Sequence, residues 1–256
     1  MEKNKNQRRL YNDLSHLWHL VSPLEDYLEE TELFCELLKN ESKIPIRELL
    51  HFGCGRGHND YIFKNHFRVT GVDLSPAMLN WAKRLNPEVD YIEGDMRDYK
   101  LGNKFDAVTA VDSVDYLITK NDLHQFFQNV YHHLNQNGIF MFILESTRET
   151  FQQDDTIVYS NSSGDEWLTV IENRFDPDGT DSEYEITFVY LYRQKGELEI
   201  FTDRHLCGLY SESEVHNLLT DVGFKVRITY YHPPDSAFGS VKSANKETFP
   251  MFLSCK

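Results

Sequence analysis

A short glycine-rich segment, Gly53-Cys54-Gly55-Arg56-Gly57, follows the apolar run Glu48–Phe52. Glycine adopts backbone conformations that other residues avoid, and because it has no Cβ the main chain can approach a ligand closely. A strand, this loop and a following helix form the arrangement in which such a loop holds a nucleotide-like ligand. The loop alone is weak evidence, because an ordinary tight turn can have the same composition.

Two acidic positions strengthen this interpretation of the loop. Asp73 ends the next strand-like run, where a carboxylate can accept hydrogen bonds from both ribose hydroxyls of an adenine nucleoside. Asp95, after the third such run, could accept from the adenine amino group, while Met96 offers an apolar face and a backbone donor. Asp73 could instead cap the next helix, and Asp95 could stabilise a turn.

The glycine spacing bears on the type of ligand. Dinucleotide-binding loops read GxGxxG, and the place of their third glycine is occupied here by His58. The third glycine of this chain comes one residue earlier, so the pyrophosphate fingerprint is not met. The loop therefore favours a ligand without phosphates and disfavours an NAD-dependent oxidoreductase.

Strand-like runs alternate with helical segments from Glu48 to Leu144, the pattern of a parallel sheet with crossover helices. The strand-like runs are Glu48–Phe52, Arg68–Val72, Val89–Ile92, Phe105–Ala110 and Ile139–Leu144. The helical segments are Asn59–Asn65, Pro76–Leu85 and Asn121–Leu134, and Ser75 is expected to cap the second of them. These elements would place the glycine loop, Asp73 and Asp95 at one edge of the sheet.

The flanking segments have other textures. Leu10–Lys39 is expected to be helical with a break near Ser22-Pro23, and the antiparallel strands expected after Glu145 are Ile157–Tyr159, Trp167–Phe175, Tyr184–Arg193 and Glu197–Leu206. We therefore expect an N-terminal helical cover (residues 1–46), an α/β domain (residues 47–150 and 207–256) and an antiparallel β insertion (residues 151–206).

The α/β segment resembles the class I S-adenosylmethionine-dependent methyltransferases in four motifs: LLHFGCGRG, VTGVDLSPAML, GDMRD and FDAVTAVDSVDYL. The resemblance implies a doubly wound, Rossmann-like, seven-stranded and mostly parallel sheet whose last strand, Phe249–Ser254, is antiparallel. It implies S-adenosylmethionine as cofactor and S-adenosylhomocysteine as product. The cofactor-binding residues it implies are Gly53, Cys54, Gly55 and Gly57 under the methionine part, Asp73 at the ribose, and Leu74, Met78, Asp95 and Met96 around the adenine.

One position departs from that family pattern. An acidic residue usually stands two places before the first glycine and helps to hold the cofactor's amino group, but this chain has His51 there. Either His51 has another role, or the amino group binds elsewhere, such as at backbone carbonyls near Ala110 and Val111.

A narrower resemblance concerns the helical cover, the β insertion and the run FTDRHLCGLYSESE. These features look like the small-molecule group that includes the amino-sugar N,N-dimethyltransferases. In that group the insertion shapes the acceptor pocket and often a dimer contact, so a homodimer through residues 151–206 is expected. The group tends to have a histidine after the fourth strand, where this chain has Asp115-Tyr116, so the sugar substrate is not transferred.

Six side chains could line the acceptor wall: Tyr11, His19, Asp112, Tyr116, Glu145 and His205. A base is needed only if the acceptor nitrogen or oxygen arrives protonated. We expect His205 or Tyr116 to orient or deprotonate the acceptor, and Tyr11, His19, Asp112 and Glu145 to contact it. Each of the six could instead be an ordinary surface, capping or core residue.

The overall charge limits the class of acceptor. Forty-one acidic against 26 basic residues give a net charge of −15, which opposes binding to nucleic acid phosphates. No apolar stretch is long enough for a membrane span, no metal-ligand spacing is present, and the four dispersed cysteines suit a reducing cytoplasm. The sequence predicts a cytoplasmic methyltransferase for N or O of a small molecule. A non-catalytic cofactor-binding sensor or partner protein, and a protein or RNA methyltransferase, are the alternatives.

Overall fold

The computed structural model describes residues 8–233 and 248–256. Residues 1–7 of the predicted N-terminal cover and residues 234–247 of the predicted methyltransferase domain lie outside the described residues. Within the described ranges no helix is long and apolar enough to cross a membrane.

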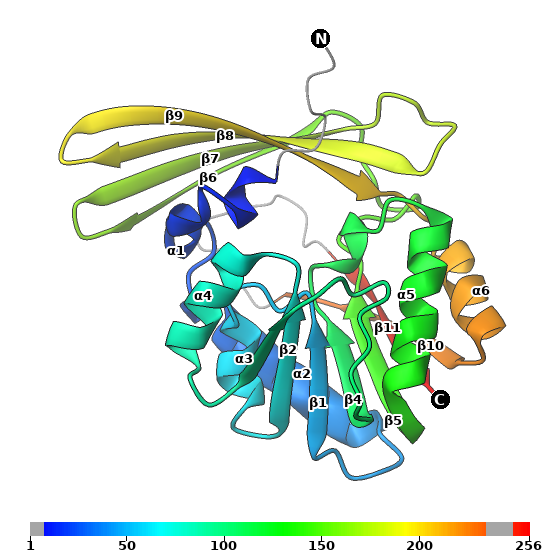
Figure 1. The fold of residues 1–256 in the computed structure, drawn as a ribbon. Coiled ribbons are helices and arrows are strands. Elements are labelled where there is room, and N and C mark those ends of the chain that lie inside the picture. The colour runs from blue at the N-terminus through cyan, green and yellow to red at the C-terminus, as the bar shows by residue number, and fades with distance from the viewer. Residues whose placement is uncertain (1–7, 234–247) are drawn as a thin grey trace.

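Seven strands form one mixed sheet in the spatial order β10-β11-β5-β4-β1-β2-β3 (Figure 1). Strands β1 to β5 are parallel, whereas β11 pairs antiparallel with both β5 and β10. The strands are β1 (Glu48–Phe52), β2 (Arg68–Asp73), β3 (Asp90–Glu93), β4 (Phe105–Ala110), β5 (Leu134–Ile143), β10 (Lys225–Tyr231) and β11 (Phe249–Cys255). The predicted fold class is therefore confirmed.

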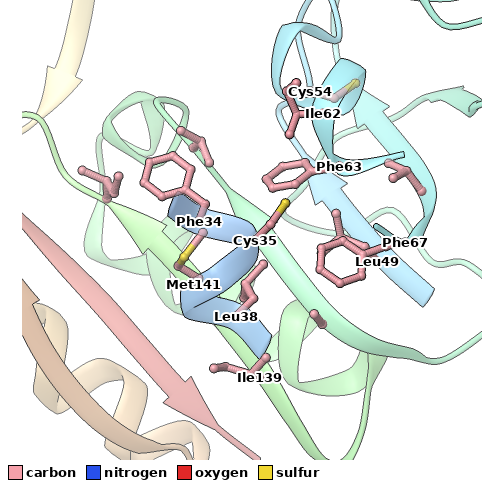
Figure 2. Packing of buried hydrophobic residues seen from close by; sticks show 14 of the residues in the cluster. Phe34, Cys35, Leu38, Leu49, Cys54, Ile62, Phe63, Phe67, Ile139 and Met141 are labelled. Atoms are coloured by element: carbon pink, nitrogen blue, oxygen red, sulfur yellow. The ribbon is translucent and has the colours of Figure 1, made fainter. Parts of the chain in front are cut away.

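Helices cover both faces of this sheet because its strands are apolar on both sides. One face packs against α5 (Lys120–His133) and α6 (Glu212–Val222), and the other against α2 (Glu25–Glu41), α3 (His58–Phe63) and α4 (Pro76–Leu85). Figure 2 shows the second face, where side chains of α2 lie against those of β1 and β5; the labelled ones include Phe34, Cys35, Leu38, Leu49, Ile139 and Met141. The two cores fix the strands whose carboxyl ends carry the site.

The β insertion forms a second, four-stranded antiparallel sheet of β6 (Asp155–Ser163), β7 (Glu166–Phe175), β8 (Glu183–Gln194) and β9 (Glu197–Gly208). Lys195 and Gly196, both at positive φ, make a tight connection between β8 and β9. Burial alternates along β8, since every second residue from Tyr184 to Tyr192 is buried. Figure 1 shows this sheet lying across the edge where β1 and β2 end.

The N-terminal segment differs from the expected helix. The break at Ser22-Pro23 is present and α2 follows it, but the first half consists of the 3-10 turns η1 (Arg9–Tyr11) and η2 (Ser15–Leu17) and the short helix α1 (Trp18–Val21). Its buried leucines, which are Leu10, Leu14, Leu17 and Leu20, belong to the core under the four-stranded sheet. Packing against that sheet, rather than helical periodicity, sets the backbone here.

Candidate active site

One large cavity, of about 990 Å³, lies between the carboxyl ends of the parallel strands and the four-stranded sheet. Its floor comes from the loops after β1, β2, β3 and β4, and its roof from the N-terminal turns and the inner face of β6 to β9. Ligand sites in open α/β sheets lie at this edge of the sheet, and a cavity of this volume holds a cofactor-sized molecule.

The glycine loop is held in conformations that favour glycine. Gly53, Gly55 and Gly57 have φ values of 67°, 53° and 73°. A Cβ on Gly53 would lie 2.4 Å from the side chain of Ser113, and one on Gly57 would lie 2.3 Å from the Tyr91 hydroxyl. Gly53, Cys54 and Gly55 line the cavity, whereas Gly57 does not and is instead packed against the residues below the loop.

Asp73 faces the cavity from the end of β2. Its Oδ2 accepts from the Gly55 backbone N–H at 2.8 Å, and its Oδ1 accepts from the Ser75 N–H at 2.8 Å. Burial raises the pKa of Asp73, against the effect of these two bonds. Each oxygen keeps a second lone pair that can accept from a ribose hydroxyl. The predicted N-cap is confirmed as Ser75, whose hydroxyl accepts from the Met78 N–H.

Apolar contacts for a base lie beside this carboxylate. Leu74 lines the cavity and is 60% exposed, whereas Met78 is fully buried and does not line it. A Cβ on Gly55 would lie 3.7 Å from Met78 Cε, so this methionine supports the loop from beneath. Met96 lines the cavity as expected and also packs against the α5 face of the core.

Asp95 has a strong partner that the sequence analysis missed. Arg97 Nη2 lies 2.6 Å from Asp95 Oδ2, and Arg97 Nη1 lies 2.9 Å from Asp122 Oδ1. The hydrogen bonds from Arg97 outweigh burial and lower the pKa of Asp95, so this carboxylate is ionised at neutral pH. All three side chains line the cavity. Arg97 stands in the GDMRD motif two residues after Asp95, and this spacing could have indicated the ion pair.

His51 lies beneath the glycine loop and outside the cavity lining. Its Nδ1 is 2.7 Å from Asp60 Oδ1, and Asp60 Oδ2 accepts from the Tyr91 hydroxyl at 2.9 Å. Asn86 donates both to that hydroxyl and to the Gly57 carbonyl, at 2.9 and 2.8 Å. The structure thus places His51 in a buried network that supports the loop, and the carboxylate of this network comes from α3 instead of β1.

Only some of the residues at the carboxyl end of β4 line the cavity. Val111 and Asp112 line the cavity, but Ala110 is fully buried and does not. Asp112 has a φ of 53°, a conformation that is strained for a residue with a side chain. Burial and the nearby Glu30 raise the pKa of its carboxyl.

A chain of four hydrogen-bonded side chains forms part of the roof. The Tyr11 and Tyr116 hydroxyls are 2.8 Å apart, and Tyr116 Oη lies 2.8 Å from His205 Nδ1. On the far side His205 Nε2 lies 2.9 Å from Asp203 Oδ2, which also accepts from the Leu10 backbone N–H. Tyr11, Tyr116 and His205 line the cavity, and they come from η1, from η3 (Val114–Tyr116) after β4, and from β9.

The pKa shifts of these side chains determine which of them donate and which accept. Burial opposes ionisation of Asp203, yet hydrogen bonds from His205 and the backbone outweigh it and lower the Asp203 pKa. Burial raises the pKa of Tyr11 and of Tyr116 well above the ordinary value, so both phenols stay protonated. Because an ionised carboxylate only accepts, His205 Nε2 donates to Asp203, and Nδ1 is free to accept from Tyr116.

The other predicted acceptor residues divide into two groups. Glu145 lines the cavity, and its carboxylate lies 3.9 Å from Arg174. His19 does not line it: its Nε2 is directed to Glu166, at 3.2 Å, on the side of the four-stranded sheet. Glu172, Arg174 and Tyr159 also line the roof, and no local sequence pattern marks them because their orientation depends on the strand register.

The floor residues fit an adenine nucleoside with an amino acid tail. Gly53 and Gly55 allow close backbone approach, Asp73 offers carboxylate oxygens to a ribose, and Leu74 exposes an apolar side chain beside it. The described residues hold no group of three or more metal-ligating side chains.

Comparison with known proteins agrees with this geometry. The methyltransferase-domain family matches residues 49–138. A putative methyltransferase of Geobacillus sp. (strain WCH70) is 30% identical, over 74% of this chain and 78% of that protein. The chain belongs to the S-adenosylmethionine-dependent methyltransferases. The enzyme class and the cofactor predicted from the motifs are thereby confirmed.

Two further relatives resemble this methyltransferase over most of its length. A dTDP-3-amino-3,4,6-trideoxy-alpha-D-glucopyranose N,N-dimethyltransferase of Streptomyces venezuelae is 29% identical, over 79% of this chain and 85% of that protein. The crystal structure of Streptomyces venezuelae DesVI superposes with a TM-score of 0.78 at 23% identity and covers 94% of this chain and 95% of that one. The second likeness concerns the fold, including the added sheet.

Proposed function

We propose that this methyltransferase methylates an amine nitrogen of a small molecule. The observation that carries the proposal is the hydrogen-bonded chain Tyr11–Tyr116–His205–Asp203, which opens onto the same cavity as the cofactor residues. An alkyl amine is protonated near neutral pH, so its nitrogen has no lone pair for attack until a proton leaves. The similarity to an amino-sugar N,N-dimethyltransferase supports the choice of nitrogen.

The mechanism assigns holding and proton transfer to different sides of the cavity. Gly53, Gly55 and Asp73 would hold S-adenosylmethionine. When bound, this cofactor supplies the methyl group of its sulfonium, and S-adenosylhomocysteine is the leaving group. The Tyr11 hydroxyl oxygen accepts a proton from the acceptor nitrogen while Tyr11 donates its own to Tyr116. Tyr116 in turn donates to His205 Nδ1, and Asp203 stabilises the resulting imidazolium. Alignment of the two reactants supplies the rest of the rate enhancement.

An acceptor site that is covered by two segments of the chain favours a small molecule over a macromolecule. The four-stranded sheet and the N-terminal turns cover the cavity. The Ser75 hydroxyl donates to the Tyr11 carbonyl and so connects the N-terminal turns to the floor. The net charge of −15 also opposes RNA as acceptor. We also propose that the chain is divided into a helical cover (residues 1–46), a methyltransferase domain (residues 47–150 and 207–256) and a β insertion (residues 151–206), and that the protein is cytoplasmic.

The outer face of the four-stranded sheet supports a homodimer as a further part of the proposal. Val158, Trp167, Leu198 and Ile200 are 57%, 50%, 43% and 60% exposed on it. Cross-strand pairing places Ile171 beside Val158 and Leu191 beside Ile200, so the apolar surface is continuous across β6 to β9. A second copy presents the same face, and two such faces related by a two-fold axis would cover each other.

A labelled methyl donor tests the proposed function. Protein, cell extract and S-adenosylmethionine with an isotopically labelled methyl group are incubated, and products are analysed by mass spectrometry. We expect one small product that carries the label on nitrogen. Cofactor binding without any labelled product would favour a non-catalytic sensor, and label on protein or RNA would contradict the small-molecule assignment.

A further inference from the structure

A second, smaller cavity of about 260 Å³ adjoins the glycine loop. Its lining consists of Leu24, Arg56, His58, Trp81, Arg84 and Leu85. Arg56 lines both this cavity and the large one, because it stands within the loop between Gly55 and Gly57. It is thus a charged side chain in the wall between the two spaces.

The guanidinium of Arg56 has no anionic partner among residues 8–233 and 248–256. Its Cζ lies 4.4 Å from the centre of the Trp81 ring, but its Nε and Nη1 are buried and meet no hydrogen-bond acceptor in the described part of the chain. Burial lowers the pKa of Arg56, which reflects the cost of removing its charge from water. A guanidinium stays charged even so, and partial burial of a charge without a partner is unfavourable.

The surrounding side chains do not compensate this charge. His58 is buried, and its own burial together with the charge of Arg56 lowers its pKa to about 3, so it is neutral. Its Nδ1 meets no hydrogen-bond partner among the residues that the structure describes. Arg84 adds a second cation 5.1 Å from the same Trp81 ring. Two guanidiniums and no carboxylate therefore line the smaller cavity of a chain whose net charge is −15.

We propose that Arg56 binds the carboxylate of the cofactor's methionine part. That carboxylate is the one anionic group of S-adenosylmethionine, and the glycine loop that carries Arg56 is the segment expected under the methionine. A planar guanidinium pairs with a carboxylate through two parallel hydrogen bonds. Glu30 and Asp112 line the same large cavity, and their carboxyl oxygens can accept hydrogen bonds from the ammonium of the same amino acid. This proposal rests on the cofactor assignment and goes beyond it by naming the residue that binds the methionine carboxylate.

Calorimetry with two ligands isolates this contact. S-adenosylhomocysteine has the carboxylate, and 5′-(3-aminopropylthio)-5′-deoxyadenosine is the same molecule without it. Arg56→Gln should weaken S-adenosylhomocysteine binding about 10- to 100-fold and leave binding of the decarboxylated ligand within about twofold of wild type. The matched control is Arg84→Gln, which removes the second, exposed guanidinium near Trp81 and should change neither affinity.

Other outcomes would overturn the inference. Equal weakening of both ligands in Arg56→Gln would show that Arg56 only shapes the loop, and no weakening of either would place the carboxylate elsewhere. If wild type bound neither ligand, the cofactor assignment itself would fail, which distinguishes the two claims.

A second readout is thermal unfolding of the protein without and with S-adenosylhomocysteine. Removal of an unpaired, partly buried cation should leave the melting temperature of the free protein unchanged or higher in Arg56→Gln. The rise in melting temperature with S-adenosylhomocysteine should shrink in this variant. A lower melting temperature of free Arg56→Gln with an undiminished rise on ligand addition would contradict the proposal.

Discussion

Asp73 is the residue on which recognition of the cofactor's ribose should depend most. We expect Asp73→Asn to lower the affinity for S-adenosylhomocysteine about 10- to 100-fold, because a charged hydrogen-bond acceptor is lost. Adenosine should lose affinity equally, since the contact is to the ribose. Calorimetry measures both, with Asp90→Asn at the opposite end of the neighbouring strand as control. An unchanged affinity in Asp73→Asn would refute the ribose assignment.

The same carboxylate predicts a pH dependence of binding. Burial raises the pKa of Asp73, so its ionised form is lost at a higher pH than that of an ordinary aspartate. Affinity for adenosine should therefore fall on acidification earlier than a normal carboxyl would allow, and Asp73→Asn should not show this fall.

Side chains could be predicted from the sequence where a motif or a strand end marks them. Asp73 and the loop glycines follow strands directly, and Tyr116 and His205 were both expected over the cofactor although 88 residues separate them in the chain. Their direct hydrogen bond depends on how the second sheet packs on the first, which no local pattern contains. Asp203 was missed, although its position two residues before His205 on a strand puts both side chains on one face.

At the scale of single elements, α6 illustrates a helix start that is written in the sequence. Ser211 and Glu214 form a reciprocal capping box, and Lys120 lies 2.6 Å from Glu214. Glu214→Gln should destabilise the protein by about 0.5–1 kcal/mol in urea unfolding, because the box and the ion pair both weaken.

The pH dependence of this difference has a defined sign. Burial opposes ionisation of Glu214, but hydrogen bonds from Lys120 and Ser211 lower its pKa from 4.5 to about 2. A depressed folded-state pKa contributes stability above the unfolded value, and this contribution is lost as pH falls from 4.5 towards 2. The gap between wild type and Glu214→Gln should close in that window; a gap independent of pH would contradict the assignment.

The support of the glycine loop gives a second prediction for an element. Asp60→Ala would leave His51 Nδ1 and the Tyr91 hydroxyl without their buried acceptor, and we expect a loss of about 3–5 kcal/mol in the free energy of unfolding. Glu41→Ala, which breaks the surface pair with Arg227, should cost no more than about 1 kcal/mol. Similar values for the two variants would show that the network does not hold the loop.

The type and bounds of an element were predicted well where its own hydrophobic periodicity determines them. They were predicted less well where tertiary packing determines them. The strands of both sheets and the helices α4 and α5 lie within a few residues of their expected bounds, apart from β5, which begins five residues earlier. The segment before Ser22 was expected to be helical, yet its leucines reach the second sheet through 3-10 turns. The donation from the Leu10 N–H to Asp203 shows how tertiary contacts replace helical hydrogen bonds there.

At the scale of the whole molecule, the second sheet has two faces with different roles. The inner face closes the cavity, and the outer face carries the apolar surface proposed for the homodimer. The double variant Trp167→Glu, Ile200→Glu should convert a dimer into a monomer in light scattering after gel filtration, because charges would be buried at the two-fold. Leu33→Glu, at an exposed leucine of α2, serves as control. A monomeric wild type at micromolar concentration would contradict the dimer.

The central claim is that the hydrogen-bonded side chains in the roof remove the acceptor's proton. Single-turnover methyl transfer from prebound, labelled S-adenosylmethionine to the acceptor found in the screen tests this claim most directly. We expect His205→Ala, Tyr116→Phe and Asp203→Asn each to slow transfer about 100-fold or more with nearly unchanged cofactor affinity, and the control His216→Ala on α6 to match wild type. Transfer at the wild-type rate in all three variants would contradict the claim.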